Sequence, residues 1–310
     1  MKRSVMAWLI LGVLLGWQQG GGVLADEVGG KVTPRQTLPA VPEPIKTADK
    51  NDQLADKGRE LPNPPAGRVP PYVMHLPGVS GTSIVDHTLR AGMKAAGFDG
   101  PFEIYDWTCH DPGIPALHNR VRNERQAQIV ADRITKQFHD KPEQPIFVTC
   151  HSGGVGPAVW ALEKLPADVK VHSFIMLAPA MSPQYDLSKA LSHVTDKAYC
   201  YWSTGDDLVL GTGTKIFGTI DGVKCEAAGK VGFSKPTMPA DAKQYDKLVS
   251  KPYEAEWARL GHVGGHVGWM AKSFIQIVVA PGLLGKTPTK AEIEAAMRGV
   301  MPEMDVQWPK

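Results

Sequence analysis

The alternation of short apolar runs with helical segments constrains the fold of this chain most strongly. From residue 70 onward, short and mainly apolar runs are separated by segments whose apolar residues recur at helical spacing. The expected strands are 72–76, 102–107, 145–149, 171–178 and 198–202, and the expected helices are 84–96, 119–138, 153–165, 187–194 and 267–279. Because such strands must be covered on both sides, the pattern predicts an α/β fold, a mostly parallel sheet flanked by helices on both faces.

The composition fits a folded globular protein and argues against a nucleic-acid partner. The chain has 310 residues, of which 43% are hydrophobic and 21% are charged, values typical of one large domain. Its formal net charge is +2, and Lys and Arg are scattered along the sequence instead of forming a basic stripe. The sequence contains no cofactor motif, and no phosphate-binding loop of the Gly-Lys-Ser/Thr type, so we expect no cofactor.

The amino-terminal residues are typical of a signal peptide. Lys2 and Arg3 precede an apolar stretch at 5–17 that is short for a membrane span, and small or apolar residues at 23–25 offer a cleavage site. An uncleaved amino-terminal anchor is the alternative. We expect three segments, a signal peptide at 1–25, a Pro/Gly-rich disordered leader at 26–69 and a folded domain at 70–310. The folded domain is then secreted or periplasmic, with no stable membrane span after signal removal.

Four cysteines are present, at positions 109, 150, 200 and 225. In an oxidising compartment an even number permits disulfides, although sequence alone does not give their connectivity. Cys200 with Cys225 is the more economical pairing.

A candidate nucleophile follows the strand expected at 145–149. This strand runs into Cys150-His151-Ser152-Gly153-Gly154 and then directly into a helix. A serine hydroxyl is a poor nucleophile until a base removes its proton and the chain presents its oxygen. A sharp turn between strand and helix presents the oxygen, and the helix N–H groups point to where an oxyanion forms. The competing interpretation is a structural helix start that an N-capping serine stabilises.

The segment 150–154 resembles the nucleophile elbow of the α/β-hydrolases, with Cys150 where that superfamily usually has glycine. The resemblance extends over 72–284. It implies a Ser, Asp and His triad in that chain order and an oxyanion hole made by two backbone N–H groups. By this correspondence Gly153 supplies one N–H, and Val79, in the turn after the first strand, supplies the other. Ser80 or Gly81 are alternative donors.

The same order places the acid after the strand at 198–202 and the base before the last helix. Asp206 is the first choice for the acid, with Asp207 as the alternate, and His266 is the first choice for the base, with His262 as the alternate. His262 and His266 are also spaced like a pair of metal ligands on a helix. The two glycines between them make a helix unfavourable, so we expect no metal.

These residues together predict an exported serine hydrolase, esterase-like or lipase-like, that acts on a small-molecule or lipid ester. Residues 178 and 198 are too close in the chain for a large cap domain between them. One alternative is a catalytically inactive α/β-hydrolase-fold binding protein of the cell envelope. Another is an amidase or peptidase that uses the same triad. The sequence leaves the acyl group, the alcohol and the oligomeric state open.

Overall fold

The computed structural model describes residues 69–206, 213, 215, 218–282 and 289–298. Within these residues the chain forms one six-stranded sheet in which every paired strand is parallel, in the order β2-β1-β3-β4-β5-β6. The strands are β1 (Tyr72–Leu76), β2 (Phe102–Ile104), β3 (Ile146–His151), β4 (Ser173–Leu177), β5 (Ala198–Trp202) and β6 (Leu248–Pro252). The parallel α/β sheet predicted from the sequence is confirmed.

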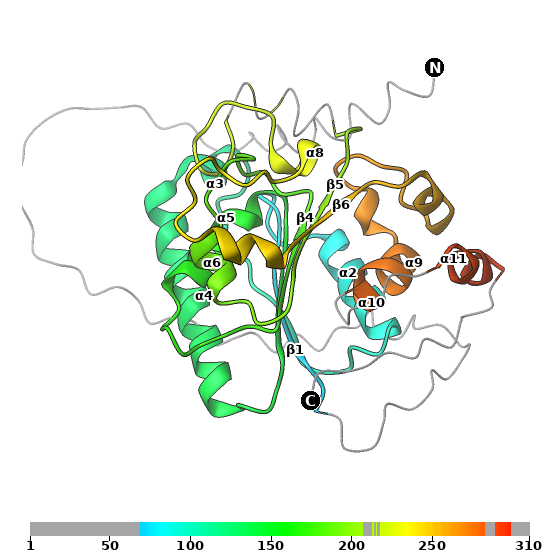
Figure 1. Ribbon diagram of the computed structural model, residues 1–310, viewed down its shortest axis with the longest axis horizontal. Helices are drawn as coiled ribbons and strands as arrows, with labels where there is room; N and C mark the ends of the chain where they lie inside the picture. Colours follow the sequence, from blue (N-terminus) through cyan, green and yellow to red (C-terminus); the bar gives the residue numbers. More distant parts are fainter. Residues whose placement is uncertain (1–68, 207–212, 214, 216–217, 283–288, 299–310) are drawn as a thin grey trace, which may run out of the picture. The chain divides into compact units, whose positions relative to one another are not determined.

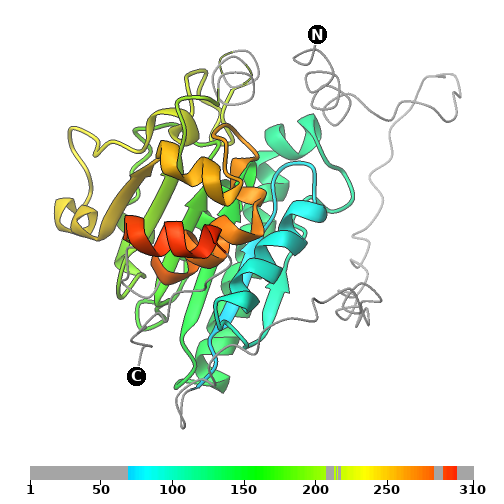
Figure 2. The ribbon, with the colours of Figure 1, turned by 90° about the vertical axis from the view of Figure 1, so that its right-hand side faces the viewer.

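Helices cover both faces of this sheet (Figure 1). One face carries α3 (Ile114–His118), α4 (Arg120–Asp140), α5 (Val155–Lys164), α6 (Ser188–Ser192) and the 3₁₀ helix η4 (Ala242–Lys247). The other face carries α2 (Ile84–Ala95), η5 (Ala255–Leu260), η6 (Gly268–Met270), α9 (Lys272–Phe274), the π-helix η7 (Ile275–Val279), α10 (Ala280–Gly282) and α11 (Lys290–Met297). Figure 2 looks onto this second face, where α2 lies beside α9 and η7.

The two layers have separate hydrophobic cores because side chains alternate along each strand. Phe174 and Met176 of β4 pack into the core under α4 and α5, whereas Ile175 and Leu177 pack into the core under α2 and η7. Every residue of β1, β3 and β4 is buried. Burial on both faces explains why these strands appear in the sequence as continuous apolar runs.

The strand β6 was not predicted, and its position explains why. It pairs only with β5 in this sheet order and is half-exposed along its length. It contains Lys251 and ends at Pro252, residues that edge strands tolerate and central strands exclude. An edge strand of this kind lacks the apolar run that identifies the central strands.

Two of the predicted helices differ in detail from a simple apolar pattern. In α4 the apolar residue Val121 is 64% exposed. It lies two residues before the buried Asn123, which places it on the opposite side of the helix. The helix expected at 267–279 is instead the short turn η6 followed by α9 and η7, with an extended residue, Ala271, between them.

The pairing of Cys200 with Cys225 was also wrong, because all four cysteines are free thiols. Cys200 lies on β5 and points into the core under α5 and α6, whereas Cys225 lies in a partly exposed loop. Burial raises the pKa of Cys200 to about 12, so this thiol stays protonated at neutral pH.

No large cap domain interrupts the described part of the sheet. Between β4 and β5 the chain forms only the short helix α6 and its flanking turns, as expected from the closeness of residues 178 and 198. In the ranges that the structure describes, no helix combines the length and apolar character needed to cross a membrane. The predicted signal peptide and nearly all of the predicted leader lie outside these ranges.

A buried polar network joins β1, β3 and α2. His75 Nε2 donates to Asp86 Oδ1 at 2.8 Å, and His75 Nδ1 lies 2.7 Å from Thr149 Oγ1. The second carboxylate oxygen of Asp86 accepts from the backbone N–H and the hydroxyl of Ser83. Burial alone would raise the pKa of Asp86, but the hydrogen bonds from His75 and Ser83 outweigh it and lower that pKa.

Replacing Asp86 by asparagine is expected to destabilise the fold in a pH-dependent way. Because the folded carboxyl has the lower pKa, its contribution is fully present above the unfolded pKa of about 3.9 and is lost as the pH falls through the folded value. We expect a loss of about 3 kcal/mol at pH 7 that shrinks below pH 4, measured by urea unfolding. The exposed Asp132→Asn is the control. A loss that is the same at pH 7 and pH 3 would contradict this account.

Candidate active site

Ser152 lies on a strained turn at the carboxyl end of β3, where the chain passes into the 3₁₀ turn η2 (Ser152–Gly154) and α5. Its φ of +52° is in the left-handed region, which is costly for a residue with a Cβ. Ala178, directly after the neighbouring β4, has a φ of +45°. The chain then turns so that the N–H of Ala180 donates to the Ser152 carbonyl at 3.0 Å, which holds the strained turn in place.

The residues after Ser152 must be glycines because other chain segments pass too close. A Cβ on Gly154 would lie 2.3 Å from the Pro77 carbonyl oxygen and 2.5 Å from that of Leu76. A Cβ on Gly153 would lie 2.4 Å from Val79 Cγ1. Since these distances are shorter than any real Cβ contact, the two glycines let the loop after β1 lie against the start of α5.

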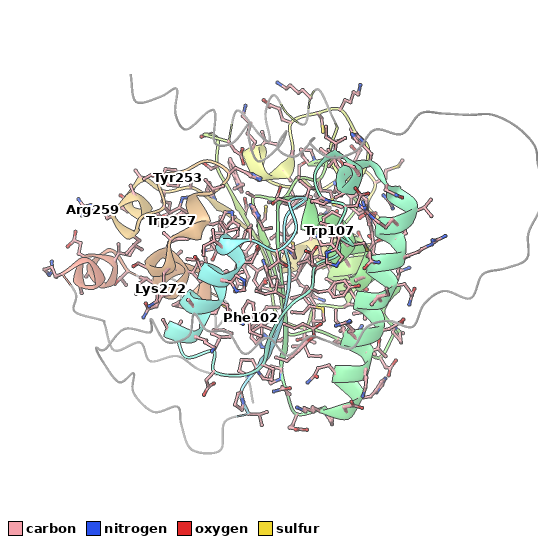
Figure 3. The ribbon with its side chains drawn as sticks, turned by 180° about the vertical axis from the view of Figure 1, so that it is seen from behind. Phe102, Trp107, Tyr253, Trp257, Arg259 and Lys272 are labelled. Carbon is pink, nitrogen blue, oxygen red and sulfur yellow. The ribbon has the colours of Figure 1, made fainter. Side chains whose placement is uncertain are left out.

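The structure brings the two predicted oxyanion donors, Val79 and Gly153, next to each other. The backbone nitrogen of Val79 is 3.7 Å from the position that a Cβ on Gly153 would occupy. Two bonds fix this loop, because Trp107 Nε1 donates to the Pro77 carbonyl at 2.7 Å and the N–H of Gly113 donates to the Val79 carbonyl at 2.7 Å. Trp107 is fully buried on the α4 side of the sheet (Figure 3).

Ser152, His266 and Asp206 form a continuous chain of hydrogen bonds. Ser152 Oγ lies 2.9 Å from His266 Nε2, and His266 Nδ1 lies 2.7 Å from Asp206 Oδ2. With the proton on Nδ1, the imidazole donates to the carboxylate and accepts from the serine hydroxyl. Asp206 is 2% exposed and Ser152 is 6% exposed, so little water competes for these bonds. This is the geometry that a general base acting on a serine requires.

His262, the alternate base, occupies a different environment. Its ring packs against Tyr253, Trp257 and Phe274, on the α2 side of the sheet where Figure 3 labels Tyr253 and Trp257. Burial lowers the pKa of His262 to about 4, and its Nδ1 accepts from the N–H of Gly264 at 3.1 Å. His266, and not His262, therefore contacts Ser152.

Two further alternatives from the sequence concern the acid at Asp207 and a metal site at His262 and His266. Asp207, the alternate acid, lies outside the described residues. The segment between His262 and His266 is a turn and not a helix, so the two rings are not arranged as i and i+4 ligands. In the described ranges, no three His, Cys, Asp or Glu side chains are grouped so that they could hold a metal ion.

Two residues beside the triad hold the backbone of His266, and one of them was missed in the sequence. Trp269 Nε1 donates to the His266 carbonyl at 2.8 Å, and His151 Nε2 donates to it at 3.3 Å. The ring centroids of His151 and Trp269 are 4.0 Å apart. Burial, with the neighbouring His266 and His75, holds the pKa of His151 well below its usual range, so His151 is neutral here. The only sequence signal for Trp269 is its position three residues after His266.

Cys150, the departure from the usual elbow, points away from the site. Its side chain is fully buried in the core under α4 and α5, and its Sγ donates to the Ile175 carbonyl at 3.6 Å. Burial raises the pKa of this thiol well above its usual value, with Cys200 nearby adding to the effect. A protonated and enclosed thiol does not compete with Ser152 as a nucleophile.

A serine on a strained strand-to-helix turn, followed along the chain by its aspartate and histidine partners, is the arrangement of the α/β-hydrolase fold. The resemblance predicted from 150–154 is confirmed at the level of the fold. No protein-family model matches the chain, and no curated protein matches it by sequence.

Several solved structures resemble the chain at low sequence identity. Lipase B of Aspergillus fumigatus has a TM-score of 0.45 at 13% identity, and the match covers 75% of this chain and 57% of that one. A cutinase-like protein from Cryptococcus sp. has a TM-score of 0.37 at 14% identity, covering 76% and 98%. A CIB-like hydrolase from Thermoplasma acidophilum has a TM-score of 0.36 at 16% identity, covering 67% and 83%. The chain thus spans little more than half of the lipase B structure. We therefore infer the function of the site from its geometry alone.

Proposed function

We propose that this chain is an exported serine hydrolase that cleaves carboxylic esters through an acyl-enzyme on Ser152. The observation that carries the proposal is the continuous contact from Ser152 Oγ through the His266 ring to Asp206. The strained turn under Ser152 adds support, because such turns occur where a nucleophile must be presented. We include export in the proposal because the basic and apolar residues at the amino terminus are typical of a signal peptide.

In the first half of the reaction, Ser152 Oγ attacks the ester carbonyl while His266 Nε2 takes its proton. Asp206 holds the imidazole with its proton on Nδ1 and stabilises the imidazolium that forms. The N–H groups of Val79 and Gly153 donate to the oxyanion of the tetrahedral intermediate. His266 then gives its proton to the departing alcohol, which leaves the acyl group on Ser152. In the second half, His266 removes a proton from water as the water oxygen attacks the acyl carbon. The second tetrahedral intermediate then breaks its bond to Ser152 Oγ, which takes the proton back from His266 as the acid leaves.

Apolar side chains beside the base favour an apolar acyl or alcohol group over a charged one. Val263 is 71% exposed and Val267 is 36% exposed, and both lie in the loop that carries His266. Small-molecule or lipid esters are therefore the proposed substrates.

Labelling with a fluorophosphonate probe and assays on matched substrates test this proposal. We expect the probe to modify Ser152, located by peptide mapping, and the protein to hydrolyse p-nitrophenyl butyrate faster than the matching p-nitroanilide. Faster hydrolysis of the anilide would favour an amidase instead. Absence of both labelling and hydrolysis would overturn the enzyme proposal in favour of a binding protein with this fold.

A further inference from the structure

One buried hydroxyl links the loop that carries the acid to the loop that carries the base. Ser203 is the first residue after β5 and is 4% exposed. Its Oγ accepts from the N–H of Gly205 at 3.3 Å and from the N–H of Gly265 at 3.1 Å. Gly205 directly precedes Asp206, and Gly265 directly precedes His266. The hydroxyl therefore contacts the residue directly before the acid and the residue directly before the base.

Glycines of both loops pack close to this hydroxyl and to each other. A Cβ on Gly264 would lie 3.3 Å from Ser203 Oγ, and a Cβ on Gly205 would lie 3.6 Å from the Gly265 nitrogen. The two loops thus meet backbone to backbone around Ser203.

Ser203 is itself held firmly by its backbone. Its N–H donates to the Gly229 carbonyl in α8 (Ala228–Val231) at 2.9 Å, and its carbonyl accepts from the N–H of Asp206 at 3.0 Å. In turn α8 is tied to the turn after β4, because the N–H of Gly229 donates to the Pro179 carbonyl at 2.7 Å. Ser203 is therefore a fixed point from which both loops can be positioned.

We propose that Ser203 is a positioning residue that sets the distance between Asp206 and His266. This inference rests on the proposed function of the triad. The acid and the base lie on different loops that are 60 residues apart in the sequence. A hydroxyl oxygen has two lone pairs and can accept both N–H groups at once. Alanine cannot accept either, so the loops lose their common point of attachment and the His266 ring drifts from Ser152.

The test compares Ser203→Ala with Ser203→Thr and with a matched control, Ser188→Ala. Ser188 is 2% exposed, and its hydroxyl bonds Asp186 and the Asp241 carbonyl next to α6 and η4, away from the triad loops. We expect Ser203→Ala to lower kcat for p-nitrophenyl butyrate by about 10-fold to 100-fold with KM changed less than twofold, because small displacements of a base cost this much. Threonine keeps the hydroxyl and should recover most of the rate.

Thermal melting and titration of active sites with the fluorophosphonate separate positioning from unfolding. Ser203→Ala and Ser188→Ala should lower Tm by similar amounts, while only Ser203→Ala lowers kcat per titrated site. An unchanged kcat in Ser203→Ala, or an equal fall in Ser188→Ala, would overturn the inference.

A second measurement needs no substrate. The low-field NMR signal of the proton between His266 Nδ1 and Asp206, assigned by its loss in His266→Ala, should broaden or vanish in Ser203→Ala and persist in Ser188→Ala. If the wild-type chain neither reacts with the probe nor cleaves esters, the proposed function fails, and this signal still decides the role of Ser203. If the chain is active and the signal is the same in Ser203→Ala, only the role of Ser203 is wrong.

Discussion

Ser152→Ala is expected to lower kcat for p-nitrophenyl butyrate by about 10⁴-fold to 10⁶-fold and to abolish fluorophosphonate labelling. The substitution removes the Oγ that lies 2.9 Å from His266 Nε2. The oxyanion donors at Val79 and Gly153 stay in place, so a small residual rate over the uncatalysed reaction should persist. The wild-type protein and the variant are compared at equal protein concentration, determined by near-ultraviolet absorbance. Their Tm values check that both are folded.

The fold should tolerate this substitution. Alanine has the same Cβ as serine, so the cost of the positive φ at this position does not change. We expect the free energy of unfolding to stay within about 1 kcal/mol of the wild-type value. Ser188→Ala serves as the control for loss of a buried serine hydroxyl elsewhere. Equal hydrolysis before and after Ser152→Ala would show that the activity does not come from this site.

The central part of the fold could be predicted because its strands are buried on both faces. The run Ala198–Trp202 appears in the structure with the predicted bounds, and the strands β1, β3 and β4 lie within one or two residues of their predicted positions. β6 could not be predicted in the same way. Its residues are partly buried or exposed, and Lys251 and Pro252 are residue types that are common in loops. The other edge strand, β2, was predicted because its residues Phe102–Ile104 alternate between apolar and polar. The residues of β6 form neither an alternating pattern nor an apolar run.

The three residues of the proposed triad could be identified in the sequence because their positions follow from chain order and turn chemistry. In a parallel sheet the carboxyl ends of all strands meet at one edge, so residues after β3 and β5 converge there. The choice of His266 over His262 followed from its position before a helix. The surroundings of His262 account for the difference physically, since Trp257 and Phe274 enclose its ring.

The residues that support the triad could not be predicted. Trp269 acts through a backbone carbonyl, and Ser203 acts through a backbone N–H that is 62 residues away in the sequence. Neither kind of contact leaves a spacing pattern. A serine after a strand or a tryptophan after a histidine is common in any α/β chain, and only the three-dimensional arrangement distinguishes these from others.

The strain at the site has a consistent physical cause. Ser152 and Ala178 are adjacent at the ends of paired strands, and both have a left-handed backbone without being glycine. Each such residue costs about 1 to 3 kcal/mol unless its surroundings impose it. Here the imposed contacts are visible, because Ala180 holds the Ser152 carbonyl and Gly153 and Gly154 admit the loop after β1. The Ser152 hydroxyl, the proposed nucleophile, is thus presented at the expense of local stability.

Asp206→Asn is expected to lower kcat by about 10⁴-fold with KM little changed. The carboxylate at 2.7 Å accepts the proton on His266 Nδ1, which leaves Nε2 free to take the serine proton. An amide can present its NH₂ to Nδ1 instead, which places the ring proton on Nε2, facing Ser152 Oγ. In that tautomer the imidazole cannot act as a base. The measurement is the kcat for p-nitrophenyl butyrate, with Tm as the test of folding.

Substitutions of two further aspartates distinguish a specific role of Asp206 from a general loss of stability and from a role of Asp207. Asp186→Asn is a matched control, because Asp186 also accepts several hydrogen bonds, from Ser188, Tyr245 and the Ala240 N–H, but does so near α6. It should lower Tm without a comparable loss of kcat per active site. Asp207→Asn tests the alternate acid directly. If Asp207→Asn lost the activity and Asp206→Asn kept it within tenfold, the orienting carboxylate would be Asp207 instead of Asp206.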